Sequence, residues 1–251
     1  MKKELYNMKI RALAILIITL ILFFSIAPFQ NVFLNLLDEN KAVIESYAKK
    51  FGASAMLSKL HDWNFYIFTQ WFGKNFGQMI PIFAIIFAFP LFSREVENGT
   101  MEFLLVRKSR DYVFYSKVFS SLIIGFSVVI IGSILPIIYS FFTGKDFFYE
   151  YALKYIIHGL IGFWFWNSVT VFFSIFFNDQ VKPILSSVGL LAITTALGFL
   201  KPLKWLNTYS YILGGKILSE GKINWIYSES LFVIGGFILL AGYYLFKNKE
   251  I

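Results

Sequence analysis

The sequence predicts an all-α polytopic membrane protein with six transmembrane helices. Of its 251 residues, 57% are hydrophobic and 20% aromatic, and only 15% are charged, against roughly a quarter in soluble domains. Apolar runs of about 17 to 25 residues, the length at which a helix crosses a bilayer, recur six times along the chain. Together these observations favour a single transmembrane domain over residues 1–251.

The six runs contain no Asp, Glu, Lys or Arg. They cover residues 12–29, 76–92, 118–141, 155–177, 183–200 and 230–246. Intramembrane charge is typical of proton relays and ion-coupled pumps, so its absence argues against those classes. We interpret His158, within the fourth run, as a packing or interfacial residue rather than a proton carrier.

Basic residues are densest before the first run and between the second and third. They are Lys2, Lys3, Lys9 and Arg11, then Arg94, Arg107, Lys108, Arg110 and Lys117. Because cytoplasmic segments carry the excess of Lys and Arg, both termini are expected in the cytoplasm of a multi-pass protein of the cell (plasma) membrane. The net charge is +8, and the basic residues behind it flank the spans and do not form one continuous stripe. This distribution favours contact with the lipid bilayer and argues against a nucleic-acid partner.

The sequence lacks the residue patterns that are typical of catalytic and metal sites. There is no cysteine, which excludes disulfides and thiolate metal sites, and neither an H-E-x-x-H pair nor a nucleophile elbow is present. We therefore expect no catalytic residue and no metal site in this chain.

Small and polar residues within the runs have two interpretations. Gly125 and Gly132, like Gly235 and Gly242, are seven residues apart and share a helix face where another helix can approach closely. A second set either packs between helices, the interpretation we favour, or lines a wet substrate path: Asn167, Ser168, Thr170, Ser174, Thr194 and Thr195.

Two segments on the outer side are patterned. Apolar residues recur at three- and four-residue steps over 33–51, which predicts an amphipathic helix outside the membrane. Residues 201–227 mix Trp and Tyr with lysines and glycines, a composition typical of an interfacial or re-entrant segment. Both segments could gate the bundle or only cap it.

The stretch between the second and third runs should fold as helix, break, short helix, break, helix. Asn98-Gly99 predicts a helix end, Thr100 a cap for a short helix, and Ser109 a cap for the next helix, with Asp111 in its first turn. Phe103, Leu104 and Leu105 would then project from a short helix outside the membrane.

This stretch resembles the loop after the second span of type-2 ATP-binding-cassette (ABC) exporter permeases. The sequence motif of that loop is E-x-x-x-G-T-x-E-x-L-L followed by P-x-S-R. The matching residues begin at Phe92 and end at Lys117, which corresponds to the lysine at the start of the third span in that family. Lys108 stands about where that family has its proline. The resemblance implies a coupling helix that docks on an ATPase subunit and an N-terminal interfacial elbow helix. It assigns ATPase coupling to Glu95, Glu97, Gly99, Thr100, Glu102, Phe103, Leu104, Leu105, Arg107, Ser109 and Arg110.

The resemblance further implies a permease that exports its substrate by alternating access in a dimer of permeases, each of which docks one of two ABC-type ATPase subunits. We expect a homodimer, with a related permease as the alternative partner. No Gly-x-x-x-x-Gly-Lys-[Ser/Thr] sequence occurs, so the chain is expected to be no enzyme, and ATP and Mg²⁺ should bind to the partner. An apolar, aromatic bundle favours an amphipathic or hydrophobic cargo, such as a peptide, an antibiotic or a lipid-like molecule. A membrane-embedded enzyme, a non-transporting scaffold or sensor, and an ion-coupled carrier remain alternatives.

Overall fold

The computed structural model describes residues 2–40 and 59–250. Helices and turns make up this part of the chain and no strand occurs in it, so the all-α prediction is confirmed. The elements are α1 (Lys2–Phe24), η1 (Ala27–Phe29), α2 (Gln30–Glu39), α5 (Trp63–Ile67), η2 (Phe68–Asn75), α6 (Phe76–Ala88), α7 (Ser93–Glu97), α8 (Met101–Arg107), α9 (Arg110–Thr143), α10 (Tyr149–Phe176), α11 (Val181–Leu197), η3 (Lys201–Leu206), α12 (Thr208–Ile212), α13 (Gly215–Glu220) and α14 (Trp225–Asn248).

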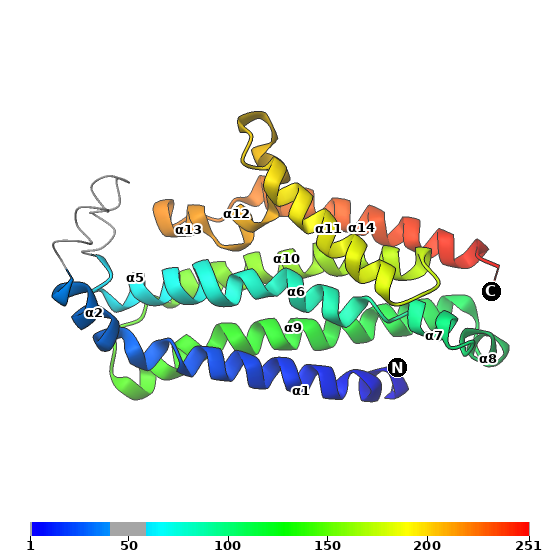
Figure 1. Cartoon of the computed structure of the whole chain (residues 1–251), viewed down its shortest axis with the longest axis horizontal. Coiled ribbons are helices and arrows are strands. Elements are labelled where there is room, and N and C mark those ends of the chain that lie inside the picture. The colour runs from blue at the N-terminus through cyan, green and yellow to red at the C-terminus, as the bar shows by residue number, and fades with distance from the viewer. Residues whose placement is uncertain (1, 41–58, 251) are drawn as a thin grey trace.

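The long helices run side by side along one axis (Figure 1), with α10 packed against α6, α9, α11 and α14. Five helical segments of the described chain are long and apolar enough to cross a membrane, and the shorter apolar helix α11 corresponds to the fifth predicted run. The protein is therefore a multi-pass membrane protein. Helix α1 begins, and α14 ends, at the end of the bundle where α7 and α8 lie (Figure 1).

The second span begins 13 residues earlier than the apolar run that predicted it. Its helix starts at Trp63, where Asp62 Oδ1 accepts a hydrogen bond of 2.7 Å from Phe65 N, and continues through the π-helical η2 into α6. The hydrophobic pattern did not predict this extension because the extension contains polar residues. Asn64 is buried because its side chain bonds to Asp146 O at 3.0 Å and to Phe148 N at 2.8 Å.

The N-terminus forms no separate elbow helix. Helix α1 is continuous from Lys2 to Phe24, because no Gly or Pro interrupts its first turns. Of the predicted amphipathic helix over 33–51, the structure shows the part in α2, and residues 41–58 lie outside the described residues. The segment 201–227 folds as η3, α12 and α13, and α12 packs on α6 and α10 through the buried Tyr211 and Ile212.

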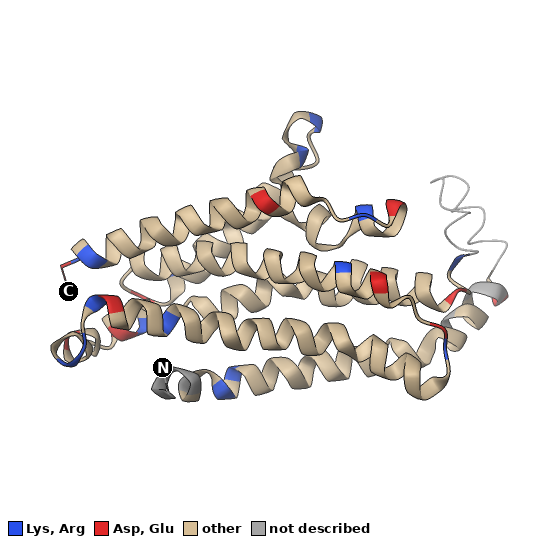
Figure 2. Cartoon of the chain, turned by 180° about the vertical axis from the view of Figure 1, so that it is seen from behind, with Lys and Arg blue, Asp and Glu red and all other residues tan. Residues whose placement is uncertain are grey.

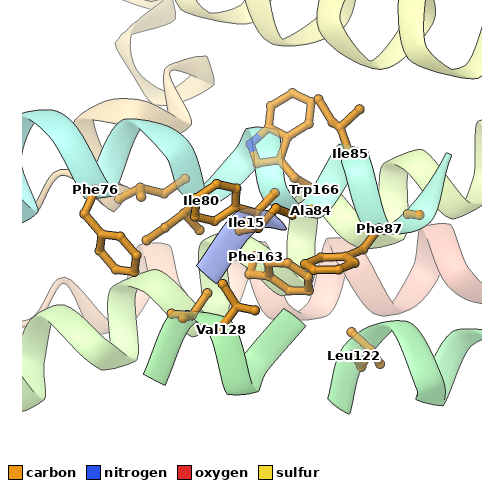
Figure 3. Close-up of a cluster of buried hydrophobic side chains, with 14 of the residues drawn as sticks. Ile15, Phe76, Ile80, Ala84, Ile85, Phe87, Leu122, Val128, Phe163 and Trp166 are labelled. Atoms are coloured by element: carbon orange, nitrogen blue, oxygen red, sulfur yellow. The ribbon is translucent and has the colours of Figure 1, made fainter. Parts of the chain in front are cut away.

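Aromatic side chains fill the centre of the bundle, and glycines make room for them. In Figure 3, Phe87 and Phe163 lie beside each other, with ring centroids 6.4 Å apart. A Cβ atom at Gly125 would lie 1.8 Å from Phe163 Cζ, and one at Gly132 would lie 2.2 Å from Phe76 Cε2. Contacts this short cannot exist, so these two glycines of α9 permit the packing of α10 and α6.

The glycines of α14 differ from each other. A Cβ at Gly235 would lie 2.6 Å from Trp164 Nε1, whereas one at Gly242 would have ordinary contact with Ile175 Cδ1 at 3.4 Å. Gly242 is therefore not needed for close approach within the protomer. A Cβ at the adjacent Gly236 would meet nothing within 4 Å.

Gly125→Ala should destabilise the protein because the buried Phe163 ring would have to move. Overpacking of a core costs about 1 to 3 kcal/mol. Gly236→Ala is the matched control and should be neutral or slightly stabilising, since Ala favours a helix more than Gly by about 1 kcal/mol. Thermal unfolding of both variants in detergent measures the difference, and equal melting temperatures would contradict the packing role of Gly125.

Candidate functional site

The turn between α7 and α8 depends on one glycine. Gly99 has a φ of +65°, in the left-handed region that glycine adopts readily. Asn98 has a φ of −86°, so only one residue of the predicted pair takes that conformation. Helices α7, α8 and α9 with two breaks between them confirm the predicted order of helix, break, short helix, break and helix.

The turn from α8 to α9 differs from one built on proline. Lys108 is extended, with φ −143° and ψ 145°, whereas a proline ring holds φ near −65°. Ser109 then caps α9 as predicted, because its Oγ accepts a hydrogen bond from Tyr112 N at 3.3 Å. Asp111 lies in the first turn of α9, near the positive end of the helix.

Helix α8 presents an apolar face, but not the one that the motif suggested. Phe103 is 72% exposed and Val106 87% exposed, whereas Leu104 and Leu105 are half-buried and pack against the core. Met101 is fully buried and anchors the helix. The apolar surface available to a partner therefore consists of Phe103 and Val106, which we call the α8 face.

The corner that carries α8 is held by a buried ion pair. Lys117 Nζ lies 3.3 Å from Glu95 Oε1, and the side chains are 2% and 12% exposed. A buried charge is costly unless it is paired, so the ammonium of α9 requires the carboxylate of α7. Thr100 stands at the N-cap position of α8 as predicted, but its side chain makes no capping hydrogen bond, and its hydroxyl group instead donates to the Glu95 carboxylate.

Two further contacts tie this corner to the rest of the bundle. Glu97 Oε2 accepts hydrogen bonds from Gln180 N at 3.2 Å and Gln180 Nε2 at 2.7 Å, which joins α7 to the turn before α11. Arg110 Nη1 donates to the carbonyl oxygens of Phe246 and Lys249, both at 2.8 Å, which joins α9 to the end of α14. Of the other two residues assigned to coupling, Glu102 lies in the first turn of α8 and Arg107 in its last turn.

The end of α14 in turn supports the end of α10. Lys249 Nζ donates to Ile175 O at 2.6 Å. Partial burial lowers the pKa of this lysine. Nearby, Asp179 Oδ1 accepts from the backbone N–H groups of Val181 and Lys182 at the start of α11. Charged residues gather at the ends of the bundle while its middle is almost free of them (Figure 2).

The polar residues considered for a substrate path are engaged within the protomer. Asn167 Nδ2 donates to Ser121 Oγ on α9 at 2.7 Å. Ser174 Oγ donates to Phe89 O at 2.6 Å and accepts from Phe92 N at 3.0 Å, which serves the backbone groups freed between α6 and α7. The others donate to carbonyl groups of their own helix: Ser168, Thr170, Thr194 and Thr195. These contacts favour the packing interpretation.

A family model described as ABC-2 family transporter protein matches residues 1–212 of the chain. The match covers α1 to α12 and therefore includes the α7–α8 corner. No curated protein and no solved structure matches the chain in the corresponding searches.

Proposed function

Since the chain belongs to the ABC-2 family of transporter proteins, we propose that it is the permease subunit of an ATP-driven exporter that works by alternating access. An ABC-2 permease is the membrane component of an ABC transporter and not its ATPase. ATP and Mg²⁺ would bind to separate ATPase subunits, two for each dimer of permeases. The ends of the chain beside α8 would lie in the cytoplasm and the bundle in the plasma membrane.

The exposed α8 face is the observation that carries this proposal. Phe103 and Val106 are apolar, exposed, and placed on a short helix beyond the ends of the long spans. Burying such side chains contributes about 1.5 to 3 kcal/mol each, so a groove on the ATPase subunit would bind them well. Helix α8 would thus act as the coupling helix.

Movement of α8 would be transmitted to three helices through the polar contacts of its corner. The Glu95–Lys117 pair connects α7 to α9, the Glu97–Gln180 bonds connect α7 to the start of α11, and Arg110 connects α9 to the end of α14. Because the side chains of these contacts are hydrogen-bonded and Lys117 is buried, a displacement of α8 would pull on the helices themselves.

A second copy of the chain would complete the transporter as a homodimer. Helix α11 buries only Pro183, Ser187 and Leu191 within the described chain, and it slants away from the bundle (Figure 1). Its remaining surface is largely apolar. In an ABC-2 dimer this helix and α1 offer surface to a second permease as well as to lipid.

Phe103→Asp should abolish docking of the ATPase while the permease stays folded, because Phe103 is exposed in the free subunit. Val106→Asp should act in the same direction. Co-purification of the ATPase with tagged permease measures docking, and thermal unfolding in detergent measures folding. Leu104→Asp is less suitable, since Leu104 is half-buried and its replacement would also destabilise the permease.

The matched control is Phe103→Leu, which keeps an apolar side chain at the same position and should retain the ATPase. If folded Phe103→Asp and Val106→Asp variants both keep the ATPase bound and the complex transports normally, α8 is not the coupling helix.

The cargo we propose is amphipathic or hydrophobic: a peptide, an antibiotic or a lipid-like molecule. It is supported by the apolar and aromatic bundle, whose six apolar runs contain no Asp, Glu, Lys or Arg. In proteoliposomes that contain the permease and its ATPase, ATP should drive movement of a labelled amphipathic peptide. Proteoliposomes that contain the Phe103→Asp permease and the ATPase should not move it. ATP-driven uptake of small cations without any response to peptides would contradict this cargo.

A further inference from the structure

A cavity of about 440 Å³ opens near the end of the bundle that faces away from α8, where η3, α12, α13 and the start of α14 meet α10. We call it the η3–α13 cavity. Its volume lies within the range of small-molecule sites. The lining combines His158 and two lysines with aromatic and amide side chains, and it includes no Asp or Glu.

His158 lines this cavity and carries a buried hydrogen-bonding atom that no described residue uses. The residue is 1% exposed, and its Nδ1 lies 2.8 Å from Tyr211 O. A carbonyl oxygen only accepts, so Nδ1 must carry the proton of this bond, and in a neutral ring Nε2 then presents a lone pair. Nε2 is buried and has no partner among the described residues. A ligand group that donates a hydrogen bond, such as a hydroxyl group, would satisfy it.

Two lysines give the cavity its charge. Lys204 of η3 and Lys216 of α13 both line it, and both are exposed. No carboxylate of the described chain forms a salt bridge with either ammonium group. Lysine ammonium groups bind phosphate as point charges, so this pair favours an anionic ligand.

The walls of the cavity are braced by hydrogen bonds that hold separate segments together. Tyr227 of α14 donates to Trp205 O of η3 at 2.6 Å. Tyr211 and Ser228 hydroxyl oxygens lie 2.6 Å apart, and the Tyr211 ring stacks on the His158 ring with centroids 4.0 Å apart. The cavity is therefore formed before any ligand enters, which lowers the entropic cost of binding.

We propose that the η3–α13 cavity binds a polyol phosphate group, with the phosphate at Lys204 and Lys216 and a hydroxyl group donating to His158 Nε2. Such a group occurs both in the headgroup of a glycerol-based anionic lipid and in water-soluble polyol phosphates. This inference concerns a site separate from α8 and does not depend on the proposed transport function.

The test uses the full chain in phosphatidylcholine nanodiscs and two probes. Soluble glycerol phosphate is titrated by calorimetry, and phosphatidylglycerol added to the nanodiscs is measured by native mass spectrometry as lipid retained on the protein. We expect at least one probe to bind. Lys204→Gln and Lys216→Gln should each weaken that binding about tenfold, the loss expected for one charge-assisted hydrogen bond.

The matched controls are Lys201→Gln and Lys222→Gln, exposed lysines of the same segment that do not line the cavity. They should leave binding unchanged. Retention of the lipid alone identifies a membrane headgroup as the source, and binding of glycerol phosphate alone identifies a soluble ligand. Failure of both probes to bind, or equal loss in the control variants, overturns the proposal.

The hydroxyl contact has its own test, which does not require a change in the buried histidine. The soluble ligand methyl phosphate lacks the hydroxyl groups of glycerol phosphate, and phosphatidylethanol, a phosphodiester with the same single negative charge, lacks the hydroxyl groups of the phosphatidylglycerol headgroup. Whichever probe binds should bind more tightly than its counterpart without hydroxyl groups. Equal affinity would show that His158 Nε2 takes no part, and would overturn the polyol assignment.

Discussion

The buried ion pair between Lys117 and Glu95 determines how the end of the bundle near α8 is built. An ammonium group that is 2% exposed requires a carboxylate partner, and that requirement fixes α7 against α9. Thr100 donates to the same carboxylate, so the position of α8 follows from it as well. The exposed α8 face can project from the bundle because Met101 and this cluster hold the rest of the corner in place.

Polar contacts stabilise the end of the bundle near α8, and apolar packing stabilises its middle. Near α8, side chains bridge helices and satisfy carbonyl groups at helix ends, as Arg110 does for α14 and Lys249 for α10. In the middle, aromatic rings fill the space left by Gly125 and Gly132. This division suits a transporter subunit: charged residues gather at the ends of the bundle, and apolar surface remains along the spans.

Local features of the fold could be predicted from the sequence, and contacts between distant segments could not. The break at Gly99 and the cap at Ser109 depend on residues within a few positions of each other. The extension of the second span to Trp63 was missed because Asn64 looks polar in the sequence and becomes acceptable only through bonds to Asp146 and Phe148.

The sequence between the second and third runs predicted the helices and breaks of this corner, but which of its apolar residues are exposed could be seen only in the structure. Leu104 and Val106 are similar in hydrophobicity, and only the packing of α8 on the core shows that Val106 is the more exposed of the two. The partners of Arg110 lie 136 and 139 residues away, and Gln180 is 83 residues from Glu97. No local pattern contains such pairs. The η3–α13 cavity was likewise not predicted, since it joins His158 of α10 to residues of η3 and α13.

The most direct measurement of the central claim is the amount of cargo transported per ATP hydrolysed by the complex with Lys117→Met, alone and combined with Glu95→Gln. If the ion pair carries the movement of α8 into the bundle, both folded variants should keep the ATPase, because Phe103 and Val106 are unchanged, and should hydrolyse ATP with severalfold less transport. The double variant removes both charges of the pair, and thermal unfolding of both variants in detergent separates the loss of transport from instability. An unchanged ratio of transport to hydrolysis in both variants would contradict the account.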